Sequence, residues 1–332
     1  MTTAASSAVS PTGPAVCDDR VVVFDTDIGY DLDDMVALWA AARSVRNLIV
    51  LTNDETRGRR AQFARALLDH MDRHDVPVVA GRELGGDHRF LLGDALIEPA
   101  VPVLTDVVEV IASECARATQ PLTWVGLGPL SNLADVLTVC PHLAEQIQLT
   151  QMGGWLDHYR DPTRASHNLR MDPAAAGLVL RAAHRPRCVL STHTNVPDIR
   201  ITPDSSLFGW LTARQAPVWS QLIRANFERW FARRPASWLG DPLTLASALG
   251  EPVVDYVTEA VRIECDARLY RDPHGRAIEV SAAVDYPRFH TWLAELLPTE
   301  AWHASHAALS TSPRPLFPCG NGTGDVRELP QS

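Results

Sequence analysis

The chain has 332 residues and a formal net charge of −10, since 30 lysine and arginine residues stand against 40 aspartate and glutamate residues. This excess of acid argues against a nucleic-acid-binding protein or one that docks on anionic membranes, because both need clustered positive charge. Hydrophobic residues make up 46% of the chain, enough for a large core, and no apolar run is long enough to span a bilayer. We therefore expect a globular protein that acts on small molecules.

The two ends of the chain differ in composition from its body. Residues 1–19 are rich in Ser, Thr, Ala and Pro and predict a flexible leader, while residues 311–332 are dense in Pro, Gly and Ser and predict a flexible tail. Residues 20–310 predict one continuous domain. Six cysteines stand far apart, and the N-terminus lacks the basic and apolar regions of a secretion signal. We expect a cytoplasmic protein.

Between these ends, short apolar runs alternate with helical patterns. In chain order they predict a strand at 21–24, a helix at 35–42, a strand at 48–51, a helix at 59–70, strands at 76–80 and 121–126, a helix from 131, a strand at 147–152 and a helix at 173–183. This alternation is typical of an α/β fold with a doubly wound, mostly parallel central sheet flanked by helices. Segment 210–249 is instead predicted to be helical, with most of its large aromatic side chains in the core.

The strongest chemical signal is an acidic loop, residues 25–34, between the first strand and the first helix. It contains five carboxylates in the run Asp25-Thr26-Asp27-Ile28-Gly29-Tyr30-Asp31-Leu32-Asp33-Asp34. Aspartate often caps helices, and Asp33 or Asp34 would suit the N-terminus of the next helix, but capping does not account for five acids. Packed carboxylates repel one another unless a cation neutralises them, and oxygen ligands favour calcium or magnesium. The loop therefore predicts a metal site.

The acidic loop resembles the signature of the nucleoside hydrolases, the inosine-uridine-preferring nucleoside N-ribohydrolase family, which typically reads DxDPGxDD. Here two residues are added and isoleucine replaces the proline. Four further segments follow in the family's order: Gly128-Pro129-Leu130-Ser131-Asn132, Met152-Gly153-Gly154, Asn168 with Asp172-Pro173-Ala174-Ala175, and Asp241-Pro242-Leu243. The resemblance covers roughly two thirds of the chain. It implies an enzyme that hydrolyses the N-glycosidic bond of ribonucleosides or related nucleosides.

The resemblance also implies a bound calcium ion and the residues that hold it. Its ligands would be Asp27, Asp34, the carbonyl of Leu127 and Asp241. Asp27 would in addition act as the general base that takes the proton of the attacking water. Asp33 would orient the hydroxyl groups of the sugar. Members of the family commonly form dimers or tetramers, so the resemblance implies a homo-oligomer.

Further positions match substrate contacts of the family. Asn168 would hydrogen-bond the sugar, with Met152 packed against it, and either Asn53 or Asp54 would supply a second sugar contact. Ser166 occupies the place of a sugar-binding glutamate. The remaining candidates, around the base, are His158, His167, Trp230, Arg233 and Trp238.

Two departures from the family pattern bear on the substrate. Gly240 stands where the family often has a histidine that protonates the leaving base, so this proton must come from elsewhere or not be needed. Ser166 lacks the carboxylate of the family's glutamate, and Arg160, Arg164 and Arg170 lie close to it in the sequence. These changes suggest either a modified or anionic 5′ substituent on the substrate, or loop arginines that are merely solvated.

Two other functions are compatible with an acidic loop after a strand. Asp25-Thr26-Asp27 resembles the nucleophile loop of magnesium-dependent phosphatases of the haloacid-dehalogenase type, but that chemistry needs a lysine and the chain contains none. The other is a calcium-dependent nucleoside or sugar sensor without activity. Asp27 argues against a sensor, because a binding protein needs no general base beside its metal. Release of base and sugar from nucleosides would separate a hydrolase from a sensor.

Overall fold

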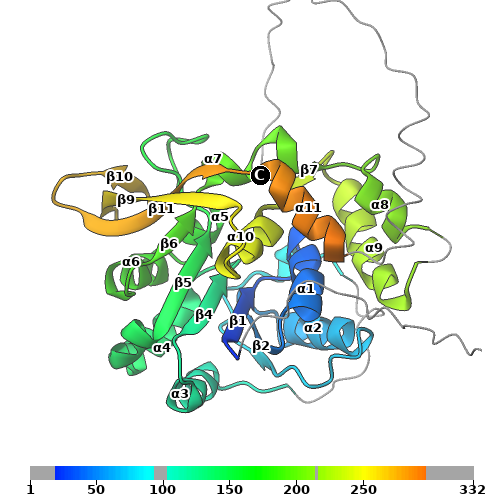
Figure 1. Ribbon diagram of the computed structural model, residues 1–332, viewed down its shortest axis with the longest axis horizontal. Helices are drawn as coiled ribbons and strands as arrows, with labels where there is room; N and C mark the ends of the chain where they lie inside the picture. Colours follow the sequence, from blue (N-terminus) through cyan, green and yellow to red (C-terminus); the bar gives the residue numbers. More distant parts are fainter. Residues whose placement is uncertain (1–18, 93–102, 214–215, 297–332) are drawn as a thin grey trace, which may run out of the picture.

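The computed structural model describes residues 19–92, 103–213 and 216–296. Nine strands form the central sheet in the order β10-β9-β11-β6-β5-β4-β1-β2-β3 (Figure 1). Its strands are β1 (Val21–Thr26), β2 (Asn47–Thr52), β3 (Val78–Ala80), β4 (Leu122–Gly126), β5 (Ile147–Met152), β6 (Arg187–Val189), β9 (Val254–Ile263), β10 (Leu269–Arg271) and β11 (Arg276–Val284). A small second sheet pairs β7 (Arg200–Ile201) with β8 (Ser237–Trp238).

The sheet is doubly wound, as predicted. From β1 the chain adds β2 and β3 on one side, and from β4 it adds β5 and β6 on the other; all these neighbours pair in parallel. The direction of winding therefore reverses between β1 and β4. In open α/β sheets, ligands bind outside the carboxyl ends of the strands at such a switch point. The fold thus places the loops after β1 and β4 beside each other.

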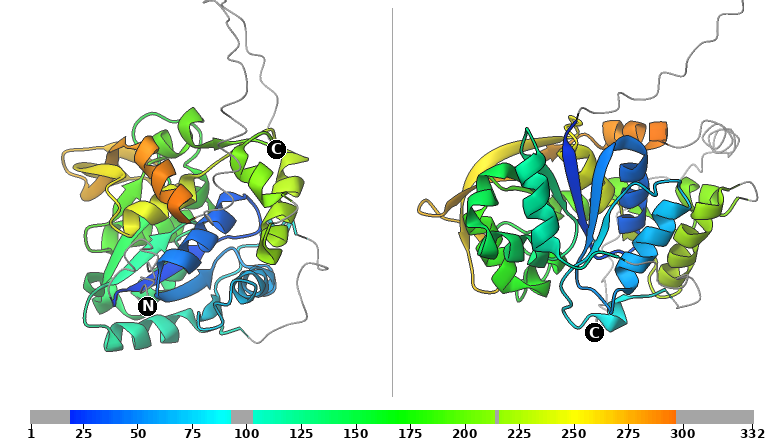
Figure 2. Two further views of the ribbon diagram at one scale, coloured as in Figure 1. Left: turned by 45° about the vertical axis from the view of Figure 1, so that its right-hand side comes forward. Right: turned by 90° about the horizontal axis from the view of Figure 1, so that it is seen from below.

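Helices cover both faces of the sheet. The helices are α1 (Asp33–Ser44), α2 (Arg59–Asp69), α3 (Val107–Arg117), α4 (Ser131–Val139), α5 (His167–Met171), α6 (Pro173–Ala182), α7 (Ser191–Thr194), α8 (Ser206–Leu211), α9 (Val218–Phe231), α10 (Gly240–Ala248) and α11 (Tyr286–Leu296). Side chains of α1, α2, α9, α10 and α11 share one hydrophobic cluster, and those of α3, α4 and α6 share another. Figure 2 shows the two helical layers on either side of the sheet.

The apolar run of β1 follows directly from this layering. Val22 and Phe24 belong to one hydrophobic cluster and Val23 to the other, because successive side chains of a strand point to opposite faces. A strand buried on both faces is apolar at every position rather than at alternate ones. This confirms the prediction of a buried parallel strand ahead of the acidic loop.

Segment 210–249, predicted to be helical, holds the end of α8, then α9 and α10, but Ser237–Trp238 within it forms strand β8 instead. Trp219 and Phe227 are buried, and the Trp219 ring stacks on Trp39 of α1 with 5.8 Å between ring centroids. These rings fix α9 against α1, which begins at the acidic loop. The expected core role of most of the aromatic side chains is confirmed.

The C-terminal part of the described chain holds elements that the sequence patterns did not predict. β9 and β11 pair in antiparallel fashion, β10 extends β9, and α11 follows. The predicted leader, apart from Asp19, the predicted tail and residues 297–310 lie outside the described residues, so the domain boundaries remain predictions. Among the helices of the described part, none is long and apolar enough to cross a membrane.

Candidate metal and catalytic site

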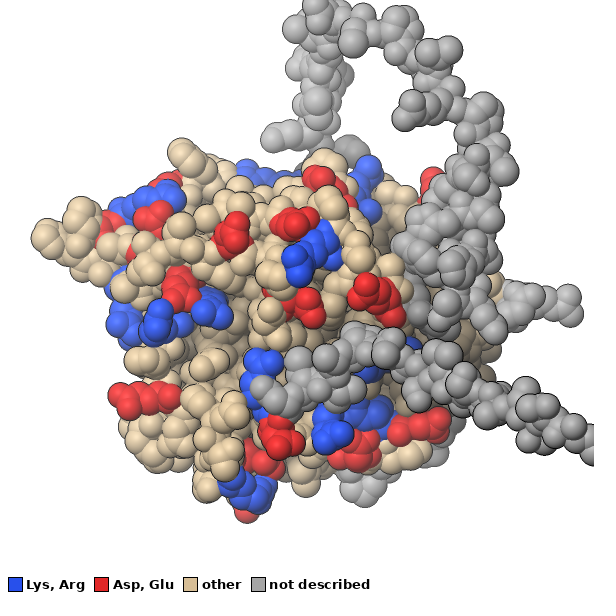
Figure 3. All heavy atoms as spheres, in the orientation of Figure 1, with Lys and Arg blue, Asp and Glu red and all other residues tan. Residues whose placement is uncertain are grey.

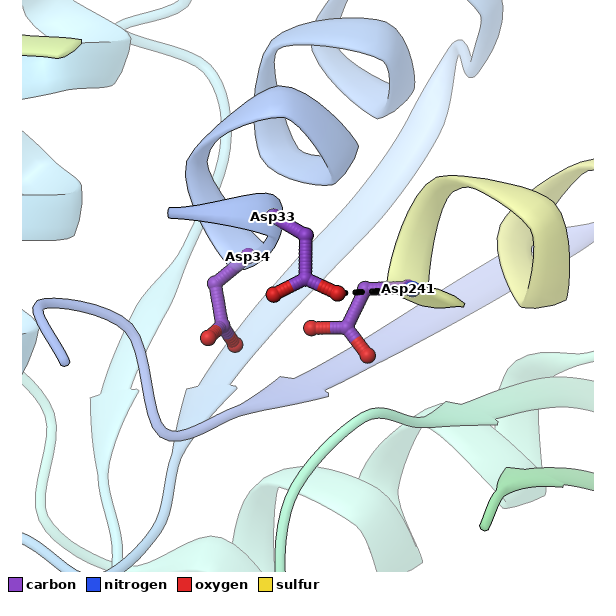
Figure 4. A group of neighbouring side chains, drawn as sticks. All are labelled: Asp33, Asp34 and Asp241. Atoms are coloured by element: carbon purple, nitrogen blue, oxygen red, sulfur yellow. Dashed lines mark hydrogen bonds between the residues drawn. The ribbon is translucent and has the colours of Figure 1, made fainter. Parts of the chain in front are cut away.

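Three aspartates from two elements converge at the carboxyl edge of the sheet. Asp33 and Asp34 lie in the first turn of α1, and Asp241 lies in the first turn of α10 (Figure 4). One carboxylate oxygen of each lies within 4.8 Å of the others. The backbone N–H of Asp241 donates to Asp33 Oδ2 at 3.2 Å. We call Asp33, Asp34 and Asp241 the three-carboxylate cluster.

The cluster is buried and carries no internal counter-charge. The three residues are at most 5% exposed, and among the described residues no arginine or histidine forms an ion pair with them. Burial, followed by the charges of neighbouring aspartates, raises the pKa of all three carboxyls well above the usual range. A hard divalent cation with oxygen ligands relieves such repulsion. The donor set therefore fits the predicted metal site.

Capping does not explain the acids of this loop. The N-cap position of α1 is Leu32, and the helix has no side-chain cap hydrogen bond. The interpretation that Asp33 or Asp34 caps the helix is therefore wrong in the strict sense, although both carboxylates lie at the positive end of the helix dipole.

Asp27 lies just after β1, beside the three-carboxylate cluster. Its charge acts on both Asp34 and Asp241, and burial raises its own pKa to about 6 even though Arg60 lowers it. Arg60 donates to the backbone carbonyls of Asp27 and Ile28 and so fixes the start of the acidic loop. Of the predicted ligands, Asp34 and Asp241 belong to the cluster and Asp27 lies next to it. Asp33, predicted to orient the sugar, lies within it.

The acidic loop turns at Gly29, which has a φ of 102° that favours glycine. A Cβ there would also come within 2.6 Å of the Phe90 ring. The carbonyl of Gly29 accepts a hydrogen bond from Leu91 N at 2.8 Å. The segment around Phe90 thus holds the loop from outside, and a glycine is required at this position.

Leu127, Met152 and Asn168 meet at the ends of β4 and β5. Leu127 follows β4, and its carbonyl accepts a hydrogen bond from Asn168 Nδ2 at 2.7 Å. The same amide lies 3.3 Å from the carbonyl of Met152 and 3.5 Å from its sulfur. A carbonyl oxygen has two lone pairs, so the Leu127 carbonyl can still accept a second partner.

The two candidates that follow β2, Asn53 and Asp54, have different surroundings. Asn53 Nδ2 donates to Asp25 Oδ1 at 2.8 Å, as does Asn132 Nδ2, and burial raises the pKa of Asp25 to about 7. Asn53 Oδ1 is buried and has no hydrogen-bond partner among the described residues. Asp54 is fully buried, and its carboxylate is engaged by arginines. Only Asn53 thus keeps an unused polar atom.

The carboxylate of Asp54 is shared by two guanidinium groups. Arg89 donates to its two oxygens at 2.7 and 2.8 Å, and Arg60 Nη2 lies 3.3 Å from Oδ2. Neither arginine was singled out from the sequence, because arginines near a helix start or in a loop are usually solvated. We call Asp54, Arg60 and Arg89 the arginine-paired cluster.

Ser166 and His167 lie at the start of α5, and His167 connects Asp27 to the rings of Tyr30 and Trp230. Ser166 Oγ accepts from Gly154 N at 2.8 Å, and His167 Nε2 lies 3.9 Å from Asp27 Oδ2. The His167 ring stacks on Tyr30, whose ring meets Trp230 edge-on at 5.5 Å. Trp230 is 6% exposed and donates from Nε1 to the Ala236 carbonyl at 2.9 Å. It is a core residue that supports Tyr30, which the sequence did not single out.

Gly240, where the family often has a histidine, is tightly enclosed. A Cβ at this position would lie 2.6 Å from the terminal methyl of Met152 and 3.1 Å from Cβ of Thr194. A histidine therefore has no room there unless Met152 and Thr194 move. The methyl group of Met152 takes part of the space that an imidazole would need.

The sequence of the chain is similar to that of known nucleoside hydrolases. The family profile described as inosine-uridine preferring nucleoside hydrolase matches residues 22–291. The pyrimidine-specific ribonucleoside hydrolase RihA of Photobacterium profundum is 28% identical over 180 residues, which cover 49% of this chain and 57% of the relative. The chain thus spans a little over half the length of this curated relative.

Solved structures share the fold over a longer stretch. The inosine-uridine preferring nucleoside hydrolase from Bacillus anthracis has a TM-score of 0.68 and 20% identity, covering 83% of this chain and 98% of that one. The plant nucleoside hydrolase PpNRh1 has a TM-score of 0.69 and 21% identity, covering 84% and 99%. At such identities the likeness shows a common fold.

Proposed function

The chain belongs to the inosine-uridine preferring nucleoside hydrolase family, and we propose that it hydrolyses the N-glycosidic bond of ribonucleosides or related nucleosides in a calcium-dependent reaction. The observation that carries this proposal is the buried three-carboxylate cluster with Asp27 beside it, at the switch point of the sheet. A purely structural role in ion pairs does not explain these buried carboxylates, since the cluster has no paired cation among the described residues.

The proposed calcium ligands are Asp27, Asp34, Asp241 and the carbonyl of Leu127, with Asp33 facing the sugar. The close approach of Asp34 and Asp241 and the spare lone pair of the Leu127 carbonyl support this assignment. When bound, calcium would anchor the vicinal hydroxyls of the sugar and lower the pKa of a nearby water. Without a cation, these carboxylates would repel one another.

Asp27 is the proposed general base. It takes the proton of the water that attacks the anomeric carbon. Arg60 fixes the backbone of Asp27 by donating a hydrogen bond to its carbonyl. The neighbouring carboxylates stabilise the positive charge that develops on the sugar ring. Asn168, Met152 and the free Oδ1 of Asn53 are the proposed sugar contacts, while Ser166, His167 and Trp230 with Tyr30 form the side of the site that faces the rest of the substrate.

The leaving base receives no proton from a side chain at position 240, because glycine has none, and Met152 and Thr194 occupy space that a histidine would need. The name of the RihA relative states that it is specific for pyrimidine ribonucleosides. We therefore propose uridine and cytidine as the first substrates to test, ahead of purine nucleosides.

The deciding experiment is reducing-sugar release from purine and pyrimidine nucleosides, with and without a calcium chelator, together with metal analysis of the purified protein. We expect release that stops on chelation and returns with calcium. Asp27→Ala should abolish turnover. As a control, Glu145→Gln replaces an exposed carboxylate that precedes β5 at the opposite edge of the sheet, and it should leave turnover unchanged. Bound calcium without release from any nucleoside would favour a sensor instead.

The proposal includes an assembly of two or four copies and a cytoplasmic location. Light scattering of the purified full chain measures the assembly, and a single-copy mass would contradict it. Fractionation of the source cells tests the location.

A further inference from the structure

The arginine-paired cluster lies near Asp27, since the charges of Arg60, Asp54 and Arg89 all act on its carboxylate, and it carries an excess of positive charge. In the arginine-paired cluster, Arg60 and Arg89 share the single carboxylate of Asp54, so two cations meet one anion. Arg89 is only 11% exposed at its side chain and is held by both oxygens of Asp54. The guanidinium group of Arg89 is therefore held in one place rather than moving freely in solvent.

Arg170 adds a further cation near this cluster. It follows His167 by three residues on α5, and its Nη2 lies 3.2 Å from His167 Nδ1. Its neighbour Arg164 pairs with Asp161 at 2.7 Å, but Arg170 forms no ion pair within the described part of the chain. A guanidinium group has five N–H donors, and this contact uses one of them.

His167 connects this charge to the proposed reaction centre. Arginine can only donate hydrogen bonds, so Nδ1 of His167 accepts and Nε2 carries the proton in the neutral ring. Nε2 is buried, has no hydrogen-bond partner among the described residues and lies 3.9 Å from Asp27 Oδ2. A buried N–H without a partner is uncommon and is expected to meet an acceptor on a ligand.

We infer that Arg170, together with Arg89 and His167, forms a subsite for an anionic group on the substrate, so that the preferred substrate is a nucleoside bearing an oxyanion such as a 5′-phosphate. This inference rests on the proposed function for the orientation of the substrate. With the sugar hydroxyls at the three-carboxylate cluster and the anomeric carbon beside Asp27, the groups left to reach Arg170 are the 5′ substituent and the base. Arginine binds phosphate and carboxylate oxygens through paired N–H donors.

The test compares kcat/KM for three matched pyrimidine substrates: uridine, uridine 5′-monophosphate and orotidine, which carries a carboxylate on its base. We expect one of the two anionic substrates to be preferred over uridine, and which one identifies the position of the anion. Arg170→Ala should lower that preference at least about tenfold, the effect of losing a charge-assisted hydrogen bond. Arg46→Ala removes an exposed arginine before β2, at the opposite edge of the sheet, and should leave the preference unchanged.

Preference for uridine over both anions, or an equal loss for charged and uncharged substrates in Arg170→Ala, would overturn the inference. If no nucleoside is hydrolysed, the proposed function fails. Calorimetry then tests the subsite separately, because it measures binding without hydrolysis. In that case the wild-type protein with calcium should bind uridine 5′-monophosphate or orotidine at least about tenfold more tightly than uridine, and Arg170→Ala should lose this difference. Equal binding of all three compounds would reject the subsite as well.

Discussion

Buried carboxylates lie at the carboxyl ends of the neighbouring strands β1 and β2, and their negative charges are compensated in different ways. After β2, Asp54 is enclosed by Arg60 and Arg89, which satisfy its charge from within the chain. After β1, Asp33 and Asp34 join Asp241 of α10 in the three-carboxylate cluster, which has no paired cation among the described residues. Burial and the neighbouring aspartates raise the pKa of each of its members well above the usual range. Carboxylates that are neutralised internally support structure, whereas those that are not need an ion from outside.

The surface shows a third arrangement. On the face in Figure 3, arginines and acidic residues are interspersed. Elsewhere in the chain, Arg82 bridges Asp135 and Asp172 with its side chain 38% exposed. Solvent already screens such pairs, so only the two buried groups carry a large electrostatic cost or gain. Four predictions test this difference.

The largest effect is expected for the arginine-paired cluster. Arg60→Met removes a fully buried cation and its hydrogen bonds to the acidic loop, which should lower the free energy of unfolding by about 3–5 kcal/mol. Urea denaturation measures it. Adding Asp54→Asn, which removes the uncompensated charge, should restore part of the loss. A loss below about 1 kcal/mol in Arg60→Met would mean that Arg89 alone neutralises Asp54.

Calcium should stabilise the protein through the three-carboxylate cluster. At a calcium concentration 100-fold above Kd, binding to the folded state alone adds about 2.7 kcal/mol, and the rise in Tm is readily measured. Asp34→Asn should remove most of this calcium-dependent rise, while Glu145→Gln, with its carboxylate outside the cluster, should keep it. An undiminished calcium effect in Asp34→Asn would move the ion to another site.

The metal-free protein should lose stability as the pH rises above the ordinary aspartate pKa of about 4. The folded state keeps protons on the cluster that the unfolded chain releases above about pH 4, since these folded pKa values are raised, so stability is lost as the pH rises. The slope is about 1.4 kcal/mol per pH unit for each proton of difference. Saturating calcium should flatten this slope. Thermal denaturation with a chelator and with calcium checks it, and equal slopes would contradict the prediction.

The smallest effect is expected at the half-exposed pair. Arg82→Met should change the free energy of unfolding by about 1 kcal/mol or less, because solvent screens the attraction to Asp135 and Asp172. Chemical denaturation at low and high salt measures this value. A loss as large as that of Arg60→Met would show that exposure does not separate the two kinds of pair.

Much of the site could be predicted because it depends on short motifs. Asp33 and Asp34 were marked as functional by the density of acid after a buried strand, and the fold brings Asp241, more than 200 residues away, to them. The choice between Asn53 and Asp54 was open in the sequence, since both follow the same strand. It depends on Arg60 and Arg89, whose positions no local pattern indicates.

Other elements escaped prediction for similar reasons. The β9–β11 ribbon has residues of mixed exposure, so its strands lack the continuous apolar runs that mark β1, β2 and β4. The enclosure of Gly240 depends on Met152 and Thr194, which come from two other elements of the fold. Contacts between distant segments leave no periodic trace in the chain.

The sequence by itself determined the α/β alternation, the acidic loop and the family, because strands buried on both faces and dense carboxylates are patterns contained in short stretches of the chain. Only the tertiary structure decided which acids are paired with arginines and which remain unpaired, and that His167, in contact with Arg170, lies beside Asp27. Charge compensation is a property of distances across the fold, and two carboxylates that look alike in the sequence differ only in the neighbours that folding brings to them.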